Sequence, residues 1–596
     1  MFDLIRKILA LLSPRERRQA YLLFGMILVM AFLDVVGIAS IMPFMAVLAS
    51  PEIVETNPYM NAVYTTLGFP DPQRFLFFLG FVVFGALVVS VSFKALTTWA
   101  VTHFTQMRNY SIGRRLLVGY LRQPYEWFLN RHSAELGKTV LSEVQLVVQG
   151  ALVPLMRFLA NATVVTAILL LLVAVDPFLA LIVGGGMGGA YALVYLALRR
   201  FLDRIGEERL AANEQRFKVV DETFGGIKEV KLGALEQDAV GRFDGPAHRF
   251  ARTQVFANVF GVMPRYALEI IAFGGMLILV LFLMRSTDGL QAALPMIALY
   301  ALAGYRLMPA LQMAYQDLTQ LRFSGPALDQ LHRDLTNLGT GTLPAAAPSD
   351  ALMPQASIRL EDITYAYPNA QRLAVDSLTL EIPAHSTVGL VGATGSGKTT
   401  TVDIILGLLE PQRGALLVDG VSITCANRGA WQRTLGYVPQ QIFLADETVS
   451  ANIAFGVPRT QIDELAVERA ARIANLHQFV IDELPEGYET IVGERGVRLS
   501  GGQRQRIGIA RALYRQPSVL ILDEATSALD NLTEQAVMDA VHNLGGEITI
   551  VMIAHRLSTV RECDRIYLLE QGGVACHGSY DELAASNARF RAMAGV

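Results

Sequence analysis

Charged residues are scarce in this chain for its length. Only 17% of the 596 residues are charged, 52% are hydrophobic, and the mean hydropathy is +0.37. This composition is too apolar for a soluble protein of this size. A formal net charge of -4 gives no electrostatic basis for binding nucleic acid. The length also exceeds what one hydrophobic core organises, so we expect at least two domains.

Cysteine is rarer still. The sequence contains three, Cys425, Cys563 and Cys576, all in the polar C-terminal third and without CxxC or Cys/His spacing. The pattern argues against a metal site and favours reduced cytosolic thiols. The basic N-terminus precedes an apolar stretch that is too long for a cleaved signal peptide, so we expect a retained membrane span there.

The first half of the chain contains many long apolar runs. Crossing a bilayer takes about 20 apolar residues, and six windows qualify, near 21–48, 75–103, 146–175, 177–198, 255–284 and 290–315. Lys and Arg gather before the first window, in 104–145 and in 199–254, whereas the outer loops contain only Arg74 and Arg285. Because Lys and Arg resist transfer across the membrane, both termini are expected on the cytoplasmic side.

The two cytoplasmic segments between spans favour helix over most of their length. We expect the spans to continue as helices below the bilayer, with short turns near Tyr125 to Asn130 and near Thr223 to Ile227; the alternative is a pair of flexible loops. Residues 338–356 are rich in Gly, Pro and Ala and predict a linker. The predicted fold is an all-α six-helix transmembrane domain at 1–337 and an α/β P-loop NTPase domain at 357–596.

A phosphate-binding motif opens the second domain. The apolar run Thr387 to Val391 leads directly into Gly392-Ala-Thr-Gly-Ser-Gly-Lys-Thr399. The glycines allow backbone N–H groups to surround phosphates, Lys398 supplies positive charge, and the Thr399 hydroxyl can ligate Mg²⁺. The predicted nucleotide ligands are Gly392, Thr394, Gly395, Ser396, Gly397, Lys398, Thr399 and Thr400.

A second apolar run begins at Val519 and ends in two carboxylates, Asp523 and Glu524. Asp523 suits the Mg²⁺ shell, and Glu524 is placed to polarise an attacking water as general base. The alternative, a strand followed by a solvated turn, is weak beside a phosphate loop upstream.

Leu499-Ser-Gly-Gly-Gln503 lies between these two elements, and with it the chain resembles the ABC ATPases. The resemblance implies that Ser500, Gly501, Gly502 and Gln503 close over the γ-phosphate held by a second subunit. It also implies a set of further roles. These are adenine stacking by Tyr367, with Tyr365 as a rival, sensing and Mg²⁺ binding by Gln440, nucleotide binding by Asp530, and γ-phosphate contact by His555.

A membrane half followed by an ATPase half is the order of an ABC half-exporter. Each ATP site in that family needs a phosphate loop from one subunit and a signature from another, and this chain has one of each. The resemblance therefore implies a dimer, with a homodimer as the default because Glu524 and His555 are both present. ATP and Mg²⁺ are the implied cofactors, and a bacterial inner membrane is the expected location.

Ionisable residues inside the predicted spans bear on the substrate, because such groups are costly in a membrane unless they face a cavity or a partner. The candidates are Lys94, Arg265, Glu269 and Arg306. Three basic groups against one carboxylate predict a cavity for phosphate or pyrophosphate. Alternatively, Arg265 pairs with Glu269 along one helix face and Lys94 extends to the membrane boundary. Two further charged residues, Asp34 and Arg157, are expected to serve packing or an interface rather than to bind substrate.

Three stretches of the membrane half resemble the bacterial lipid-linked oligosaccharide flippases. They are Met263 to Tyr266 with Glu269, Tyr305 to Pro309, and Ile41 to Phe44. The resemblance implies a polyprenyl-pyrophosphate glycan as substrate and Lys94, Arg265 and Arg306 as its ligands. It also implies a short helix within 49–74 at the outer membrane surface, whose apolar stripe comprises Ile53, Val54, Tyr59, Met60, Val63, Tyr64 and Leu67.

Two other functions stay open. The first alternative is an exporter of peptides or hydrophobic drugs, and about 20 residues before the first span leave no room for a peptidase domain that processes exported peptides. The second is an ATPase that drives a signalling partner without transport.

Overall fold

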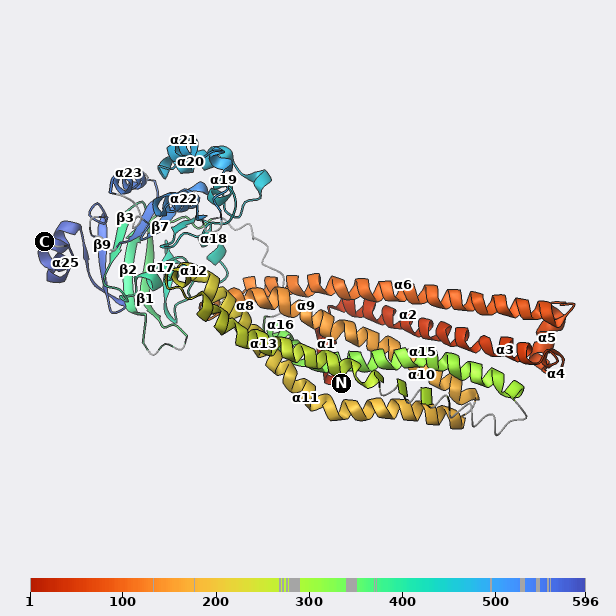
Figure 1. Cartoon of the computed structure of the whole chain (residues 1–596). Helices are drawn as coiled ribbons and strands as arrows, with labels where there is room; N and C mark the ends of the chain where they lie inside the picture. The colour runs from red at the N-terminus through yellow and green to blue at the C-terminus, as the bar shows by residue number, and fades with distance from the viewer. Residues whose placement is uncertain are drawn as a thin grey trace. The chain divides into compact units, whose positions relative to one another are not determined.

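The chain forms two units in the computed structural model (Figure 1). Unit 1 comprises Met1–Gln123 and Arg131–Leu343, and unit 2 comprises Pro124–Asn130 and Pro344–Val596. The structure describes residues 2–594 except 132, 176, 267–268, 271–272, 275–276, 278–289, 339–350, 369, 371, 494–495, 526–530, 543–546, 555–556 and 558. Most of the predicted linker lies outside the described residues.

Helices make up the described part of unit 1. They are α1 (Phe2–Leu11), α2 (Pro14–Ala39), α3 (Ile41–Ala49), α4 (Ile53–Thr56), α5 (Pro58–Thr66), α6 (Pro72–Leu121), α8 (Ser133–Lys138), α9 (Val144–Val147), α10 (Val153–Val175), α11 (Pro177–Gly225), α12 (Ile227–Leu232), α13 (Glu236–Val262), α15 (Leu290–Phe323) and α16 (Gly325–Asn337). Two π-helical segments, Thr139–Glu143 and Val148–Leu152, join α8, α9 and α10.

The segments predicted to extend the spans on the cytoplasmic side are helical, as expected. Helix α6 has 50 residues and α11 has 49, so each measures about 75 Å at 1.5 Å per residue, more than twice a hydrocarbon core of about 30 Å. The alternative of flexible loops is therefore wrong. Both predicted turns exist: α7 (Tyr125–Leu129) follows α6, and α12 follows α11.

Three stretches of the described chain are long and apolar enough to cross a membrane, namely Pro14–Ala49, Pro72–Leu121 and Glu135–Val175. They contain the first three predicted spans. The other three windows fall on α11, α13 and α15, and much of the 255–284 window lies outside the described residues. The first span is not one helix: α2 ends at Ala39 and α3 begins at Ile41. The ring of Pro43 cannot continue a helix, because it lacks an N–H and clashes with the carbonyl four residues earlier.

The outer segment differs from the single surface helix predicted for it. It forms two short helices, α4 and α5, because Pro58 starts a new helix after the Asn57 cap. Four of the seven members of the apolar stripe pack inward: Val54 is buried, and Ile53, Met60 and Tyr64 contact an apolar cluster that contains Phe75. The other three, Tyr59, Val63 and Leu67, are exposed, so only these three are available to lipid.

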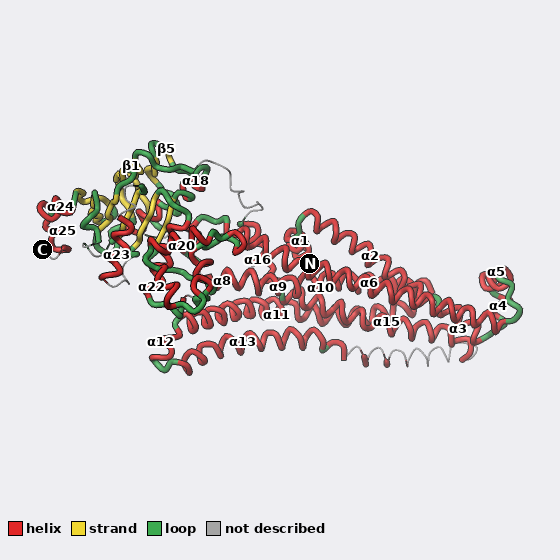
Figure 2. Tube along the Cα trace, turned by 90° about the horizontal axis from the view of Figure 1, so that it is seen from above, coloured by secondary structure: helices red, strands yellow, loops and turns green. Residues whose placement is uncertain are grey.

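Unit 2 is an α/β domain with two sheets (Figure 2, strands in yellow). The strands are β1 (Ser357–Tyr365), β2 (Val375–Pro383), β3 (Thr387–Val391), β4 (Arg413–Val418), β5 (Val421–Ser422), β6 (Leu435–Val438), β7 (Val519–Asp523), β8 (Thr549–Ile553), β9 (Arg565–Glu570) and β10 (Gly573–Gly578). The helices after α7 are α17 (Lys398–Ile405), α18 (Arg428–Gln432), α19 (Val449–Ile453), α20 (Glu464–Ile473), α21 (His477–Glu483), α22 (Gly501–Tyr514), α23 (Asn531–His542), α24 (Tyr580–Ser586) and α25 (Ala588–Ala594).

The larger sheet positions the predicted nucleotide site. Its order is β10-β9-β3-β8-β7-β6, with parallel pairing from β9 to β6 and an antiparallel edge at β10. Strand β7 sends Leu520 and Leu522 into one hydrophobic core and Val519 and Ile521 into another. Because both faces are covered, β3 and β7 consist entirely of buried residues. The smaller antiparallel sheet has the order β2-β1-β4-β5.

Helix α7 belongs to unit 2, although the predicted domain boundary placed it with the membrane half. The Tyr365 hydroxyl donates a hydrogen bond to Glu126 Oε1 at 3.1 Å. Burial and the nearby Glu126 carboxylate raise the pKa of Tyr365. The segment that connects two long helices thus forms part of the surface of the ATPase unit.

Candidate functional site

The phosphate loop follows β3, which lies between β8 and β9. The loop folds only with glycine at two positions. Gly392 has φ +153°, and a Cβ there would lie 2.3 Å from the Leu569 carbonyl oxygen. Gly397 has φ +100°, and its Cβ would lie 2.7 Å from the Ala374 carbonyl oxygen. The backbone therefore adopts the tight loop expected before a helix N-terminus that binds phosphate.

Two polar side chains of this loop lack the partner that a phosphate would supply. Lys398 is 6% exposed, and among the described residues its Nζ donates only to carbonyl oxygens of its own loop, Gly392 at 2.7 Å and Ala393 at 3.1 Å. Burial lowers the pKa of Lys398, which Glu524 and Asp523 partly oppose. The buried Ser396 Oγ has no hydrogen-bond partner among the described residues. Both observations fit a site built for an anion.

Two acidic residues stand at the end of β7. Asp523 is 6% exposed and accepts a hydrogen bond from the Tyr437 hydroxyl at 3.5 Å. Glu524 has φ +51°, an uncommon conformation for a residue with a Cβ, and its N–H donates to the Ile553 carbonyl at 3.1 Å. Gln440 Nε2 donates to Glu524 Oε2 at 2.8 Å. The strained turn thus brings the predicted general base and the predicted sensing residue together.

The signature forms the N-terminus of α22. Ser500 caps this helix: its Oγ accepts from the Gln503 N–H at 3.2 Å, and its own N–H donates to Gln503 Oε1 at 2.7 Å. The serine and glutamine of the motif therefore make a capping box, which the sequence analysis did not foresee although the spacing contains it. Gly501 and Gly502 supply the first N–H groups of the helix. An open helix N-terminus of this kind binds anions.

Tyr365 and Tyr367 differ sharply in exposure. Tyr365 is 1% exposed, whereas Tyr367 is half-buried. The Tyr367 hydroxyl is 3.1 Å from Thr400 Oγ1 at the start of α17, and the two tyrosine rings meet edge to face with centroids 5.2 Å apart. Because a fully buried ring cannot stack on a nucleotide base, the exposure of Tyr367 favours it over Tyr365 for that role. Two other predicted residues, His555 and Asp530, lie outside the described residues.

The membrane residues predicted to bind substrate are placed differently from one another. Arg306 Nη1 lies 3.0 Å from Asp34 Oδ1, and their side chains are 18% and 1% exposed. Ser90 also donates to Asp34 Oδ1, at 2.5 Å. Three helices, α2, α6 and α15, therefore meet at a buried polar cluster. Asp34, which was assigned to packing, offsets one of the three positive charges that the sequence analysis counted.

Arg265 and Lys94 are more accessible. Arg265 Nε donates to Glu269 Oε1 at 2.7 Å, the pairing that the sequence analysis kept as an alternative, yet the Arg265 side chain remains 48% exposed. Lys94 is exposed on α6. The structure does not bring Lys94, Arg265 and Arg306 together through any hydrogen bond or ion pair within its described part.

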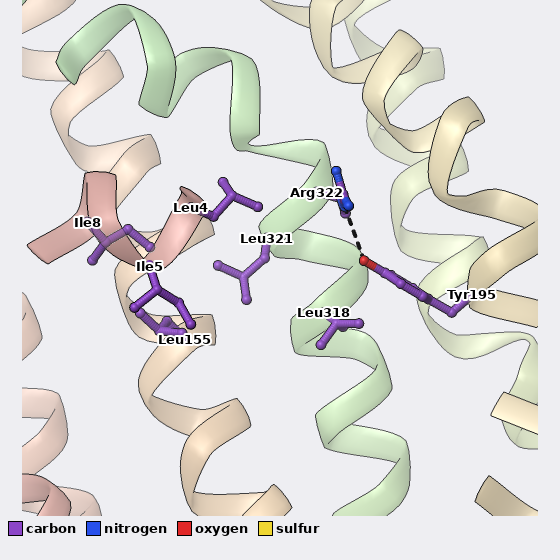
Figure 3. Close-up of a pocket in the computed structure, with 8 residues that line it drawn as sticks. All are labelled: Leu4, Ile5, Ile8, Leu155, Tyr195, Leu318, Leu321 and Arg322. Carbon is purple, nitrogen blue, oxygen red and sulfur yellow. Dashed lines mark hydrogen bonds between the residues drawn. The ribbon is translucent and has the colours of Figure 1, made fainter. Parts of the chain in front are cut away.

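Described residues of unit 1 line two recesses that bear on the site. The first, between α1, α10, α11 and α15, is lined by leucine and isoleucine side chains and bordered by Arg322, which donates to the Tyr195 hydroxyl at 3.1 Å (Figure 3). Its free volume of about 10 Å³ is at the limit for a single water, so it is a packing defect. The second, between α11 and α13, measures about 160 Å³. It is lined by Phe201, Arg204, Ile205, Glu208, Arg252, Thr253 and Phe256.

Comparison with known proteins gives the family. Residues 375–527 match the family model "ABC transporter", and residues 28–287 match "ABC transporter transmembrane region". The "ATP-dependent lipid A-core flippase" of Cupriavidus metallidurans is 33% identical over 477 residues, which is 79% of each protein. The chain belongs to the ABC transporter family. The transporter is of the half-exporter type, with a transmembrane domain fused to an ABC ATPase, and its ATPase activity is coupled to transport.

Other relatives show how widely this architecture is used. The transporter is 31% identical to the "Cyclolysin secretion/processing ATP-binding protein CyaB" of Bordetella pertussis, over 87% of this chain and 71% of that one. Its fold matches the "Structure of a bacterial Atm1-family ABC exporter with ATP bound" with a TM-score of 0.72, 24% identity and 97% coverage of both chains. The predicted fold class is therefore confirmed.

Some residues of the transporter's sites gave no signal in the sequence. Tyr191 on α11 has a buried hydroxyl with no partner among the described residues, and its ring packs on Tyr315 with centroids 5.1 Å apart. In an apolar stretch of sequence, a tyrosine cannot be distinguished from the other hydrophobic residues, so its buried hydroxyl gives no signal. Glu126 likewise resembles any exposed helix carboxylate until Tyr365, 239 residues later, is placed beside it.

Proposed function

We propose that two copies of the transporter share two ATP sites and use them to move a phosphorylated glycolipid across the bacterial inner membrane. Lipid-linked oligosaccharides, predicted from the sequence, and the lipid A-core named for relatives both belong to this class. The observation that carries the substrate class is the recess of about 160 Å³ between α11 and α13, which two arginines line.

The ATP-site part rests on the loop, the carboxylates and the signature. Each chain supplies one phosphate loop and one signature, so a second copy completes each site. Thr399, Gln440 and Asp523 are the residues that would hold Mg²⁺, whose charge offsets that of the β- and γ-phosphates. Glu524, held by Gln440, is oriented to accept the proton of the attacking water. His555 and Asp530 keep their predicted roles at the γ-phosphate and the nucleotide.

The recess has the chemistry of a phosphate site. Arg204 and Arg252 line it, both are exposed, and within the described part of the chain neither forms an ion pair. Glu208 removes one of the two positive charges, which leaves a net positive site. A volume of about 160 Å³ equals that of roughly five waters, enough for a phosphate group, whose paired oxygens suit guanidinium donors.

The position of the recess suits a lipid more than a soluble anion. Residues 201–208 follow the predicted span 177–198 closely, and residues 252–256 include the start of the predicted span 255–284, so the recess lies at the expected cytoplasmic boundary of the membrane. Phe201, Phe256 and Phe260 form an aromatic cluster beside it, with centroids 5.5–6.1 Å apart. Basic pockets next to apolar surface at this depth bind phosphorylated lipid headgroups. Arg265, exposed just beyond the end of α13, would be the next basic group for such a headgroup.

The test is reconstitution in liposomes with either a short-chain polyprenyl-pyrophosphate sugar or a lipid A-type glycolipid. We expect one of them to stimulate ATP hydrolysis and to lose access to a non-permeant enzyme only when ATP is present. The double variant Arg204→Ala/Arg252→Ala should lose this stimulation and keep basal hydrolysis. Arg249→Ala is the matched control, because Arg249 also lies between α13 and α11, where it donates to Gln215 at 2.6 Å, but does not line the recess.

The outcome that overturns the substrate class is equally specific. Stimulation by neither glycolipid, together with stimulation by a peptide or hydrophobic drug, would do so. Unchanged glycolipid stimulation in the double variant would remove the recess from the transport path.

A further inference from the structure

The side chain of Asn452 anchors the backbone of a segment that follows Gln440. Asn452 lies on α19 and is fully buried. Its Oδ1 accepts from the Ala445 N–H at 2.9 Å, and its Nδ2 donates to the carbonyls of Ala445 at 3.0 Å and Thr448 at 3.1 Å. One amide group therefore satisfies backbone groups at both ends of residues 445–448.

Arg511, on α22, binds the same region from the other side. Its Nη1 donates to the Phe443 carbonyl at 2.7 Å, its Nε to the Asn452 carbonyl at 2.8 Å, and its Nη2 to Asn452 Oδ1 at 3.2 Å. The guanidinium also stacks over the Phe455 ring, 4.8 Å from its centroid. Burial lowers the pKa of Arg511 to about 10, so the side chain stays charged at neutral pH and its hydrogen bonds are charge-assisted.

These bonds link two parts of the ATPase that serve different nucleotide sites. Phe443 lies three residues after Gln440, which contacts Glu524 in the site of its own chain. Helix α22 begins at the signature, Ser500 to Gln503, which under the shared-site arrangement proposed above serves the nucleotide of the partner chain. Among the described hydrogen bonds of Asn452, those with Arg511 are the ones that reach α22.

We propose that Arg511 and Asn452 are positioning residues that fix the segment after Gln440 to α22, so that the sensing glutamine and the signature move as one body. A displacement of Gln440 at one site then displaces the signature at the other. This coupling rests on the shared-site part of the proposed function and not on the substrate, and its tests use ATP hydrolysis without glycolipid.

The experiment uses the full-length transporter in lipid nanodiscs. Arg511→Met keeps much of the side-chain volume but removes all three donors. We expect kcat for ATP to fall about 10- to 100-fold, the range for a catalytic group that is misplaced by about 1 Å, and the Hill coefficient for ATP to fall toward one. Binding of ATP without Mg²⁺ should change less than about twofold, because the phosphate loop and Tyr367 are not part of this network.

The matched control is Arg506→Met on the same helix. Arg506 instead donates to the Asn475 carbonyl at 2.7 Å and lies over the Phe479 ring, 5.7 Å from its centroid. We expect its kcat and Hill coefficient to stay within about twofold of those of the unsubstituted transporter. An equal loss in Arg506→Met would show that any damage to α22 has this effect, which would overturn the assignment.

A double-mutant cycle separates positioning from a general structural role. If Arg511 acts through Gln440, the double variant Gln440→Ala/Arg511→Met should hydrolyse ATP no more than about twofold slower than Gln440→Ala alone. If the two effects on kcat multiply instead, the residues act independently and the proposal is wrong. If Arg511→Met lowers the thermal midpoint, the cycle is repeated with Arg511→Lys. Lysine keeps the charge but can reach only some of the oxygens of Phe443 and Asn452 that accept from Arg511.

Discussion

The buried pair of Arg306 and Asp34 raises the question of whether Arg306 holds helices together or binds the transported lipid. The paired atoms are 3.0 Å apart, and Asp34 is 1% exposed. At an effective dielectric constant of about 20 their attraction is about 5 kcal/mol, and removing one partner of a buried pair costs about 3–5 kcal/mol because the other charge stays buried. Ser90 still donates to Asp34 after the arginine is removed, so we expect the lower end of that range.

Arg306→Met should therefore lower the free energy of unfolding by about 3 kcal/mol. The double variant Arg306→Met/Asp34→Leu should recover most of this loss, since no unpaired charge remains in the bundle. The measurement is denaturation by SDS in mixed micelles, carried out on the unsubstituted protein, both single variants and the double variant at one pH and salt concentration.

Transport by the same four proteins then distinguishes the two roles of Arg306. If the arginine serves packing alone, the stable double variant transports glycolipid at close to the normal rate. If it is a substrate ligand, the double variant is stable and inactive. A coupling free energy below about 0.5 kcal/mol between the two substitutions would refute the reasoning, because contacts of this kind are not additive.

Three further outcomes are expected. Glu524→Gln should keep ATP binding and abolish phosphate release; a normal hydrolysis rate would remove the general-base role. Tyr367→Ala should weaken ATP binding by about 1–3 kcal/mol, the value of one base–aromatic stack, whereas Tyr365→Phe, which loses only a hydroxyl, should leave nucleotide affinity unchanged by fluorescence titration. Burial raises the pKa of Asp403 from 3.8 to about 6, so its folded form holds a proton more tightly than its unfolded form, and stability falls as pH rises from about 4 to about 6. Asp403→Asn should therefore raise the thermal midpoint at pH 7 but not at pH 4, measured without nucleotide and with chelator; equal effects at both pH values would contradict this.

The nucleotide site could be predicted largely from the sequence because its determinants are local. An apolar run that is buried on both faces must be a central strand, and the parallel pairing of β3 and β7 with β8 between them holds the residues after both strands at the same edge of the sheet. The same holds for the long helices, whose continuous helix-forming runs follow directly from apolar windows. For each of these helices the pattern and its consequence lie within about 50 residues of one another.

Contacts between distant segments could not be predicted in this way. Arg306 and Asp34 are 272 residues apart in the sequence. The apolar pattern of each helix does not indicate which other helix it packs against. Asn452 and Arg511 look like ordinary helix residues in the sequence. Their side chains bind backbone carbonyls, and because every residue has a carbonyl, the sequence does not show which ones are bound. Asn57 and Pro58 did mark the break between α4 and α5, yet the apolar stripe across them suggested one continuous helix.

The membership of Pro124–Asn130 in the ATPase unit has a practical consequence for anyone who works with that unit alone. A chain trimmed to begin at residue 344 would lack this piece, and the Tyr365 hydroxyl would lose its acceptor, Glu126. The fragment would also lack Tyr125, whose pKa is raised by burial and by the nearby Asp403 and Tyr367, so a neighbour of the predicted adenine-stacking residue would be missing. Solubility and nucleotide affinity measured on such a fragment would describe an uncapped surface, and supplying residues 124–130 as a peptide should partly restore the native behaviour.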